Sequence, residues 1–151
     1  MDDVLRPLKN QLLELKLKHL AAQLDDFMLT ASCSDKPYAE LLQDFLAVEI
    51  RQRRSVSMDK RLRLANLPTF DTPLDLETYD FAKRTGISKR QIVELTSSFR
   101  WIDKAYNILF FGGSGLGKSF LASYIAYKAI EGGYTAIFIS MHDLASLLKT
   151  E

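Results

Sequence analysis

One short stretch of the chain, residues 112–119, combines residue types that can hold an anion. It reads GGSGLGKS, which is the spacing G-x-x-x-x-G-K-S of a P-loop, or Walker A motif. Glycines let the backbone turn tightly and aim its N–H groups inward, while a following helix N-terminus adds partial positive charge. We expect Lys118 to reach the β- and γ-phosphates of a nucleotide and the Ser119 hydroxyl to coordinate Mg²⁺. The predicted nucleotide-binding residues are Gly112, Gly113, Ser114, Gly115, Leu116, Gly117, Lys118 and Ser119.

The segments around this motif fit its chemistry. The apolar run 107–111 predicts a buried strand before the loop, and 120–130 predicts a helix after it, ended by the glycines at 132–133. A second apolar run, 135–139, predicts another strand, and Ser140 can cap a last helix. Strand, helix and strand in this order predict a βαβ unit with parallel strands and a right-handed crossover. Upstream, Ser88 and Gln91 have the spacing of a helix capping box.

The first part of the chain predicts helices only. Leucines and aromatic residues recur at three- and four-residue steps from Leu8 to about Leu29, which predicts one amphipathic helix. A second helix is expected from about Tyr38 to Leu67, with an interruption near residues 55–57 left open, before Pro68 ends it. We therefore expect a small all-α domain over 1–67, a linker over 68–80 and a P-loop domain over 81–151. The predicted fold class is α/β.

Composition and cysteine content indicate the compartment in which the protein works. The chain has 151 residues, 47% of them hydrophobic and 26% charged, and a net charge of +1. Cys33 is the one cysteine, so an internal disulfide is impossible and a reducing cytoplasm is expected. The start lacks a signal-peptide core, and no apolar run approaches the roughly 20 residues of a membrane span. We expect an intracellular protein with no membrane partner.

A basic segment between residues 51 and 63 is a candidate DNA contact. Six cations stand there against Asp59 alone, and on a helix they could contact phosphates with little sequence preference. A solvated helix face is the competing interpretation. The candidate residues are Arg51, Arg53, Arg54, Lys60, Arg61 and Arg63.

Several of these segments together resemble the IstB family, the ATP-binding helper proteins of insertion-sequence transposition. The resemblance is strongest over Ile87–Leu148, in QIVEL at 91–95, NILFFG at 107–112 and the P-loop. YAELL at 38–42 and the basic stretch before Leu67-Pro68 extend it to the N-terminal part. The resemblance implies an AAA+ fold with a βαβ core, ATP and Mg²⁺ as ligands, and ATP-dependent homo-oligomers on double-stranded DNA. It also implies a transposase partner or, by kinship with DnaC-type loaders, a replicative helicase.

The chain also departs from that family. An AAA+ ATPase needs an acidic strand end (Walker B), sensor residues and an arginine finger, and no such strand follows the run at 135–139. The AAA+ core is therefore expected to be incomplete, ending after its second strand. Because phosphoryl transfer relies on those parts, we expect negligible hydrolysis, and whether the chain is an enzyme stays open.

Two other classes of function compete with this interpretation. A small-molecule P-loop kinase usually places its loop near the N-terminus, whereas 111 residues precede Gly112. A non-catalytic remnant that binds DNA or a protein would lack useful nucleotide affinity. Phe99, Trp101 and Tyr106 stand where AAA+ proteins often contact adenine, although core packing is the favoured role for each.

Overall fold

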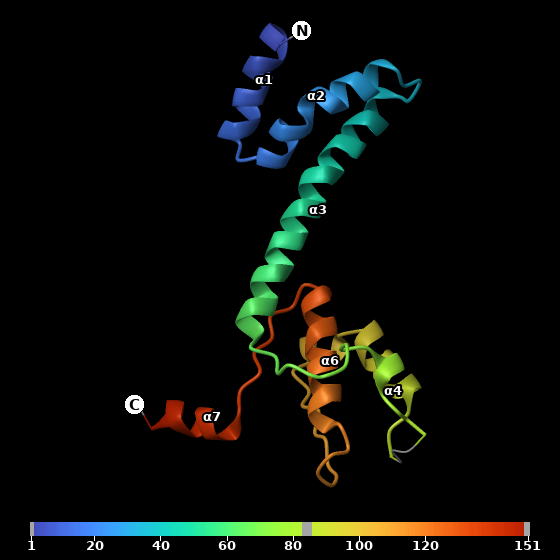
Figure 1. The fold of residues 1–151 in the computed structure, drawn as a ribbon, viewed down its shortest axis with the longest axis vertical. Coiled ribbons are helices and arrows are strands. Elements are labelled where there is room, and N and C mark those ends of the chain that lie inside the picture. Colours follow the sequence, from blue (N-terminus) through green and yellow to red (C-terminus); the bar gives the residue numbers. More distant parts are fainter. Residues whose placement is uncertain (1, 83–85, 150–151) are drawn as a thin grey trace. The chain divides into compact units, whose positions relative to one another are not determined.

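Figure 1 shows a computed structural model of the chain, which describes residues 2–82 and 86–149. The chain separates into two compact units, Met1–Ser57 and Met58–Glu151. The third helix, α3, spans Tyr38–Ala65 and therefore runs from the first unit into the second. Each unit has a hydrophobic cluster of its own.

The first unit is a helical hairpin completed by the start of α3. Helix α1 spans Asp2–Glu14 and α2 spans Lys18–Ser32, so the single helix predicted over 8–29 is broken. Lys16, between them, has a φ of 58°, in the left-handed region. The break lets α1 and α2 pack on each other, which buries leucines from both. The cluster holds Leu12, Leu20, Ala21, Leu24 and Phe45.

A buried carboxylate fastens the hairpin to α3. Glu49 is only 4% exposed and accepts hydrogen bonds from the backbone N–H groups of His19, at 3.1 Å, and Leu20, at 3.3 Å. These amides belong to the first turn of α2, where they have no intrahelical partner. Arg53 donates to the same carboxylate at 2.9 Å. Burial alone would raise the pKa of Glu49, but the hydrogen bonds from Arg53 and the two amides outweigh it and leave the pKa below its ordinary value.

Helix α3 is uninterrupted between residues 55 and 57, the position where the sequence left a break open. It ends at Ala65, and Asn66 follows with a φ of 49°. Two residues later comes Pro68, which cannot continue a helix.

The second unit holds the remaining helices. They are the 3₁₀ turn η1 (Leu76–Thr78), α4 (Lys89–Ser97), α5 (Arg100–Asp103), α6 (Lys118–Glu131) and α7 (Met141–Leu148). The capping box predicted at Ser88 is confirmed, because its hydroxyl accepts from the Gln91 amide and the Gln91 side chain accepts from the Ser88 amide. Helices α4 and α6 pack on each other around Ile92 and Leu121. Residues of α7 are all exposed.

The predicted α/β fold class is wrong for this structure. Residues 2–82 and 86–149 contain helices and turns but no strand, so the predicted βαβ unit with its AAA+ sheet is absent there. The two apolar runs, 107–111 and 135–139, have no regular secondary structure. A strand is held by hydrogen bonds to a neighbour, yet Phe138 donates instead to the carbonyl of Ala65 at the end of α3, at 2.7 Å. The runs stay partly in solvent, with Leu109 at 74% and Phe111 at 87% exposure.

Candidate nucleotide-binding site

Residues 112–119 lie between the irregular run 107–111 and the start of α6. Gly115 and Gly117 both have a φ of 76°, a left-handed conformation that costs side-chain-bearing residues energy. Gly117 is the N-cap of α6 and supplies no side chain to bond the helix's first N–H groups. These amides, together with the positive end of the helix dipole, are what a phosphate group requires.

The ammonium group of Lys118 folds back over the loop. Its Nζ donates to the carbonyl of Gly112 at 3.0 Å and to the carbonyl of Gly113 at 2.6 Å. An ammonium group carries three hydrogens, so these two bonds leave one for a further acceptor. The loop thus holds a full positive charge across its own start, close to the helix N-terminus.

A cleft of about 500 Å³ opens beside the loop. One wall comes from the segment before α4 and the other from the loop and the first turn of α6. Ser119 lines this cleft, and none of the described residues that line it carries a carboxylate. The lining residues are Phe70, Thr72, Thr78, Tyr79, Ser114, Gly115, Gly117, Lys118, Ser119 and Phe120.

The residues lining the cleft could supply only part of the coordination shell of Mg²⁺. Magnesium keeps several waters and takes its other oxygens from substrate phosphates and one or two protein groups. The Ser119 hydroxyl can be one such group. Across the described residues, no cluster of three or more histidine, cysteine or acidic side chains could hold a metal ion by itself. A metal at this cleft would therefore depend on the phosphates it accompanies.

The aromatic residues beside the loop differ from the three that the sequence singled out. Trp101 donates through Nε1 to the carbonyl of Leu95 at 3.0 Å, and Phe99 packs on Tyr134 with ring centroids 5.3 Å apart. Tyr106 is 64% exposed, and none of the three lines the cleft with Lys118.

The cleft's own aromatic wall is made by Phe70, Tyr79 and Phe120. Phe120 lies edge-on to Phe70 at 5.3 Å and stacks with Tyr79 at 5.8 Å. The first two residues precede the P-loop by more than thirty positions, in the stretch interpreted as a linker. The sequence did not predict Phe70 and Tyr79 as site residues, and their aromatic side chains were the only signal that could have found them.

The candidate DNA-contacting cations of the first unit differ in their surroundings. Arg53 is engaged twice, with the Glu49 carboxylate and with the carbonyl of Lys16, both at 2.9 Å. Arg51 donates through Nε to a carbonyl one turn earlier in α3, at 3.3 Å. Arg54 is exposed, and no ion pair or hydrogen bond joins it to another described residue. Of these three, Arg54 has the side chain most available to an outside partner.

The candidate DNA-contacting cations of the second unit also comprise one that is held internally and two that are exposed. Arg61 donates through Nη1 to the carbonyl of Gly133 at 3.1 Å and is partly buried. Its Nε is buried without a hydrogen-bond partner in the described part of the chain. Lys60 and Arg63 are exposed. They can reach a phosphate without giving up an internal contact to a described residue.

The chain matches the protein family described as "IstB-like ATP binding protein" over residues 10–151. The match takes in most of the sequence, and the chain belongs to this family. The resemblance inferred from the P-loop and its flanking segments is confirmed. This is a family of ATP-binding proteins.

Named relatives come from bacterial insertion sequences. An "Insertion sequence IS21-like putative ATP-binding protein" of Bacteroides fragilis (strain YCH46) is 38% identical over 137 residues, 91% of this chain and 67% of the relative. The "Insertion sequence IS5376 putative ATP-binding protein" of Geobacillus stearothermophilus is 38% identical over 120 residues, 79% of this chain and 46% of the relative. The "Insertion sequence IS21 putative ATP-binding protein" of Pseudomonas aeruginosa is 30% identical over 138 residues, 91% of this chain and 51% of the relative. The chain therefore spans between 46% and 67% of the length of these relatives.

The helices can also be compared with what a membrane-spanning segment requires. Within residues 2–82 and 86–149, none of the helices combines the length and the apolar character that crossing a bilayer requires.

Proposed function

We propose that the chain binds ATP together with Mg²⁺ through residues 112–119 and serves as an ATP-binding helper of insertion-sequence transposition. The observation that carries the proposal is the loop itself. It combines left-handed glycines, an α6 N-terminus without a side-chain cap and the Lys118 ammonium at the loop's start. The nucleoside would lie along the aromatic wall of the cleft, beside the partly exposed ring of Phe70.

The Lys118→Ala variant tests this function. It removes the positive charge nearest the γ-phosphate, and hydrogen bonds to charged groups contribute about 1.5–3 kcal/mol. Calorimetric titration with ATP and Mg²⁺ should therefore show affinity at least about tenfold weaker than wild type. Lys128→Ala is the matched control, because it removes a lysine from the same helix whose ammonium pairs with Glu131 and lies outside the cleft. Equal affinity in wild type and Lys118→Ala would overturn the proposed site.

Double-stranded DNA is the second ligand we propose. Arg54 in the first unit and Lys60 and Arg63 in the second are exposed cations on α3, and each can neutralise a phosphate independently of the others. Binding through such contacts would be salt-dependent and largely indifferent to base sequence.

Transposition is favoured over helicase loading by the relatives. The names of those described above all place them in insertion sequences. We accordingly propose a transposase as protein partner, with ATP-dependent self-association, in the cytoplasm. Cys33 is exposed and unpaired, as a reducing compartment allows. Sedimentation of the protein with and without ATP and Mg²⁺ tests the self-association.

A further inference from the structure

The segment Asp75–Tyr79, which we call the strap, is a well-held piece of backbone. Leu76, at its centre, is 4% exposed and belongs to the hydrophobic cluster of the second unit. The Asp75 side chain accepts from the Glu77 amide at 3.2 Å, and the Thr78 hydroxyl donates to the Asp75 carbonyl at 2.7 Å. These bonds cap η1 at its start and close it on itself. The strap therefore holds Tyr79 at a defined place.

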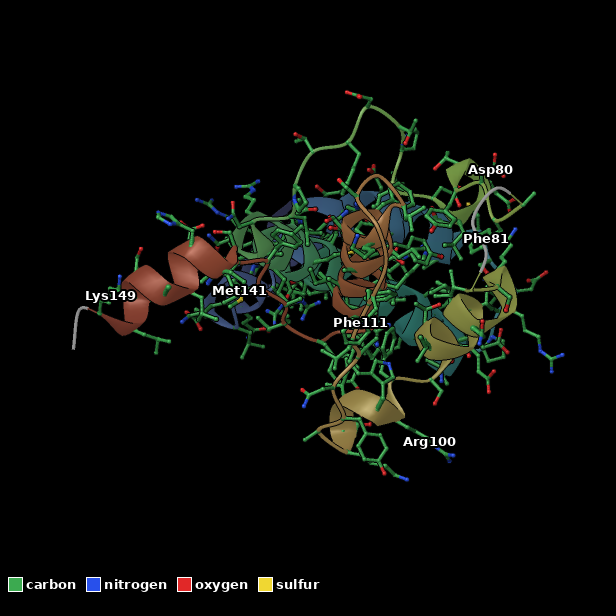
Figure 2. The ribbon with its side chains drawn as sticks, turned by 90° about the horizontal axis from the view of Figure 1, so that it is seen from below. Asp80, Phe81, Arg100, Phe111, Met141 and Lys149 are labelled. Carbon is green, nitrogen blue, oxygen red and sulfur yellow. The ribbon has the colours of Figure 1, made fainter. Side chains whose placement is uncertain are left out.

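A surface ion pair adds to this attachment. Lys89, the first residue of α4, pairs with Glu77 of the strap. Both side chains are substantially exposed, so the pair contributes little to stability. Asp80 and Phe81, where the chain leaves the strap, are labelled in Figure 2. Phe81 packs on Tyr79 with ring centroids 4.6 Å apart, which supports the tyrosine ring from the side of the strap.

Tyr79 joins the strap to the P-loop at two points. Its hydroxyl donates to the carbonyl of Leu116 at 2.8 Å, across 37 positions of the sequence. Its ring stacks with Phe120, in the first turn of α6, at an interplanar angle of 25°. Only 7% of the tyrosine is exposed, so this hydrogen bond is largely shielded from water. Tyr79 thus contacts the loop before the lysine and the helix after it.

The bond to Leu116 controls more than one carbonyl. A trans peptide is planar, and its C=O and N–H point in opposite directions. Holding the Leu116 carbonyl therefore also fixes the direction of the Gly117 N–H, one of the amides at the loop's end. The Leu116 side chain closes over the loop's start, since a Cβ added at Gly112 would lie 3.1 Å from Leu116 Cδ1.

We propose that Tyr79 is a positioning residue for the phosphate chain of a bound nucleoside triphosphate. Its hydroxyl holds the Leu116–Gly117 peptide in the orientation that the loop presents to phosphate, and its ring supports Phe120 at the start of α6. The proposal rests on the proposed nucleotide-binding function. Without the hydroxyl, this peptide is free to rotate, and some binding energy is spent on ordering it.

Tyr79→Phe tests the role of the hydroxyl alone, because the ring and its packing remain. Two probes are titrated with Mg²⁺ into the whole chain: ATP, and inorganic tripolyphosphate used to displace ATP. A typical net hydrogen bond corresponds to a roughly three- to tenfold change in affinity. We expect Tyr79→Phe to weaken both probes by the same factor in that range, since both use the loop.

Tyr134→Phe is the matched control. It makes the same chemical change in the same unit, removing a hydroxyl that donates to Asp103 at 2.9 Å, and Tyr134 does not line the cleft. Affinity for both probes should equal that of wild type. Thermal unfolding of each variant shows whether the unit stays folded at the temperature of the titration.

Three results would overturn the proposal. Unchanged affinities in Tyr79→Phe would show that the hydroxyl does not position the loop. Weaker ATP binding with unaltered tripolyphosphate displacement would assign the hydroxyl to the nucleoside instead. Failure of tripolyphosphate to displace ATP from wild type would show that the phosphate cradle does not carry binding. Failure of the proposed function is distinct, because then Lys118→Ala would bind ATP as wild type does.

Discussion

Removing the exposed cations of α3 should flatten the salt dependence of DNA binding. Arg54, Lys60 and Arg63 are exposed, whereas Arg53 and Arg61 are engaged within the protein. Each neutralised phosphate adds about 0.9 to the slope of log K against log salt on duplex DNA. Three contacts therefore account for about two to three units of slope, and changing all three residues to alanine should remove that amount.

Fluorescence anisotropy with duplex DNA at several salt concentrations measures the slope directly. The matched control changes Arg90, Arg100 and Lys104 to alanine, which removes the same three charges from exposed positions outside α3. Figure 2 labels Arg100 at the start of α5. The control separates the effect of net charge from that of position and should leave the slope nearly unchanged.

Two results would refute the reasoning. The slope of the α3 variant could equal that of wild type while circular dichroism shows a folded protein, which would favour a solvated helix face. Alternatively, both triple variants could flatten the slope equally, which would assign the effect to overall charge. The first outcome would leave the helical N-terminal part of the chain as an element for binding protein rather than DNA.

Three further predictions concern stability and turnover. The pKa of Glu49 is lower in the folded state than its ordinary value of 4.5. Its carboxylate therefore stabilises the fold fully at any pH well above that ordinary pKa, and this stabilisation is lost as the pH falls through the lowered pKa. Glu49→Gln should thus melt at a lower temperature at pH 7, and the difference from wild type should shrink in acid; a constant difference would count against the ion pair that the buried Glu49 carboxylate forms with Arg53. Gly132→Ala should destabilise the protein by about 1–3 kcal/mol in chemical denaturation, because the added Cβ would lie 2.8 Å from Phe99 Cε2; unaltered stability would mean that the ring moves aside freely. The 151-residue polypeptide should release negligible phosphate from ATP, since no carboxylate lines the described cleft, and turnover abolished by Lys118→Ala would contradict this.

Features that depend on neighbours in the chain were predictable. The P-loop spacing located the left-handed glycines and the start of α6, because the turn and the helix need only the residues that form them. The capping box at Ser88 is similarly local, since its two hydrogen bonds span three positions. The P-loop spacing indicated nucleotide chemistry, and together with the stretches at 91–95 and 107–112 it carried the resemblance to the IstB-like family.

Features that depend on distant partners required the tertiary structure. The runs 107–111 and 135–139 have strand-like composition, but a strand exists only where a second segment completes its hydrogen bonds. No pattern in the sequence shows which cations are held internally, and Arg53 is engaged by a carboxylate and a carbonyl that only folding brings to it. The hydrogen bond from Tyr79 to Leu116 crosses 37 positions. Local residue types determined the phosphate loop, and long-range packing decided what holds it in place.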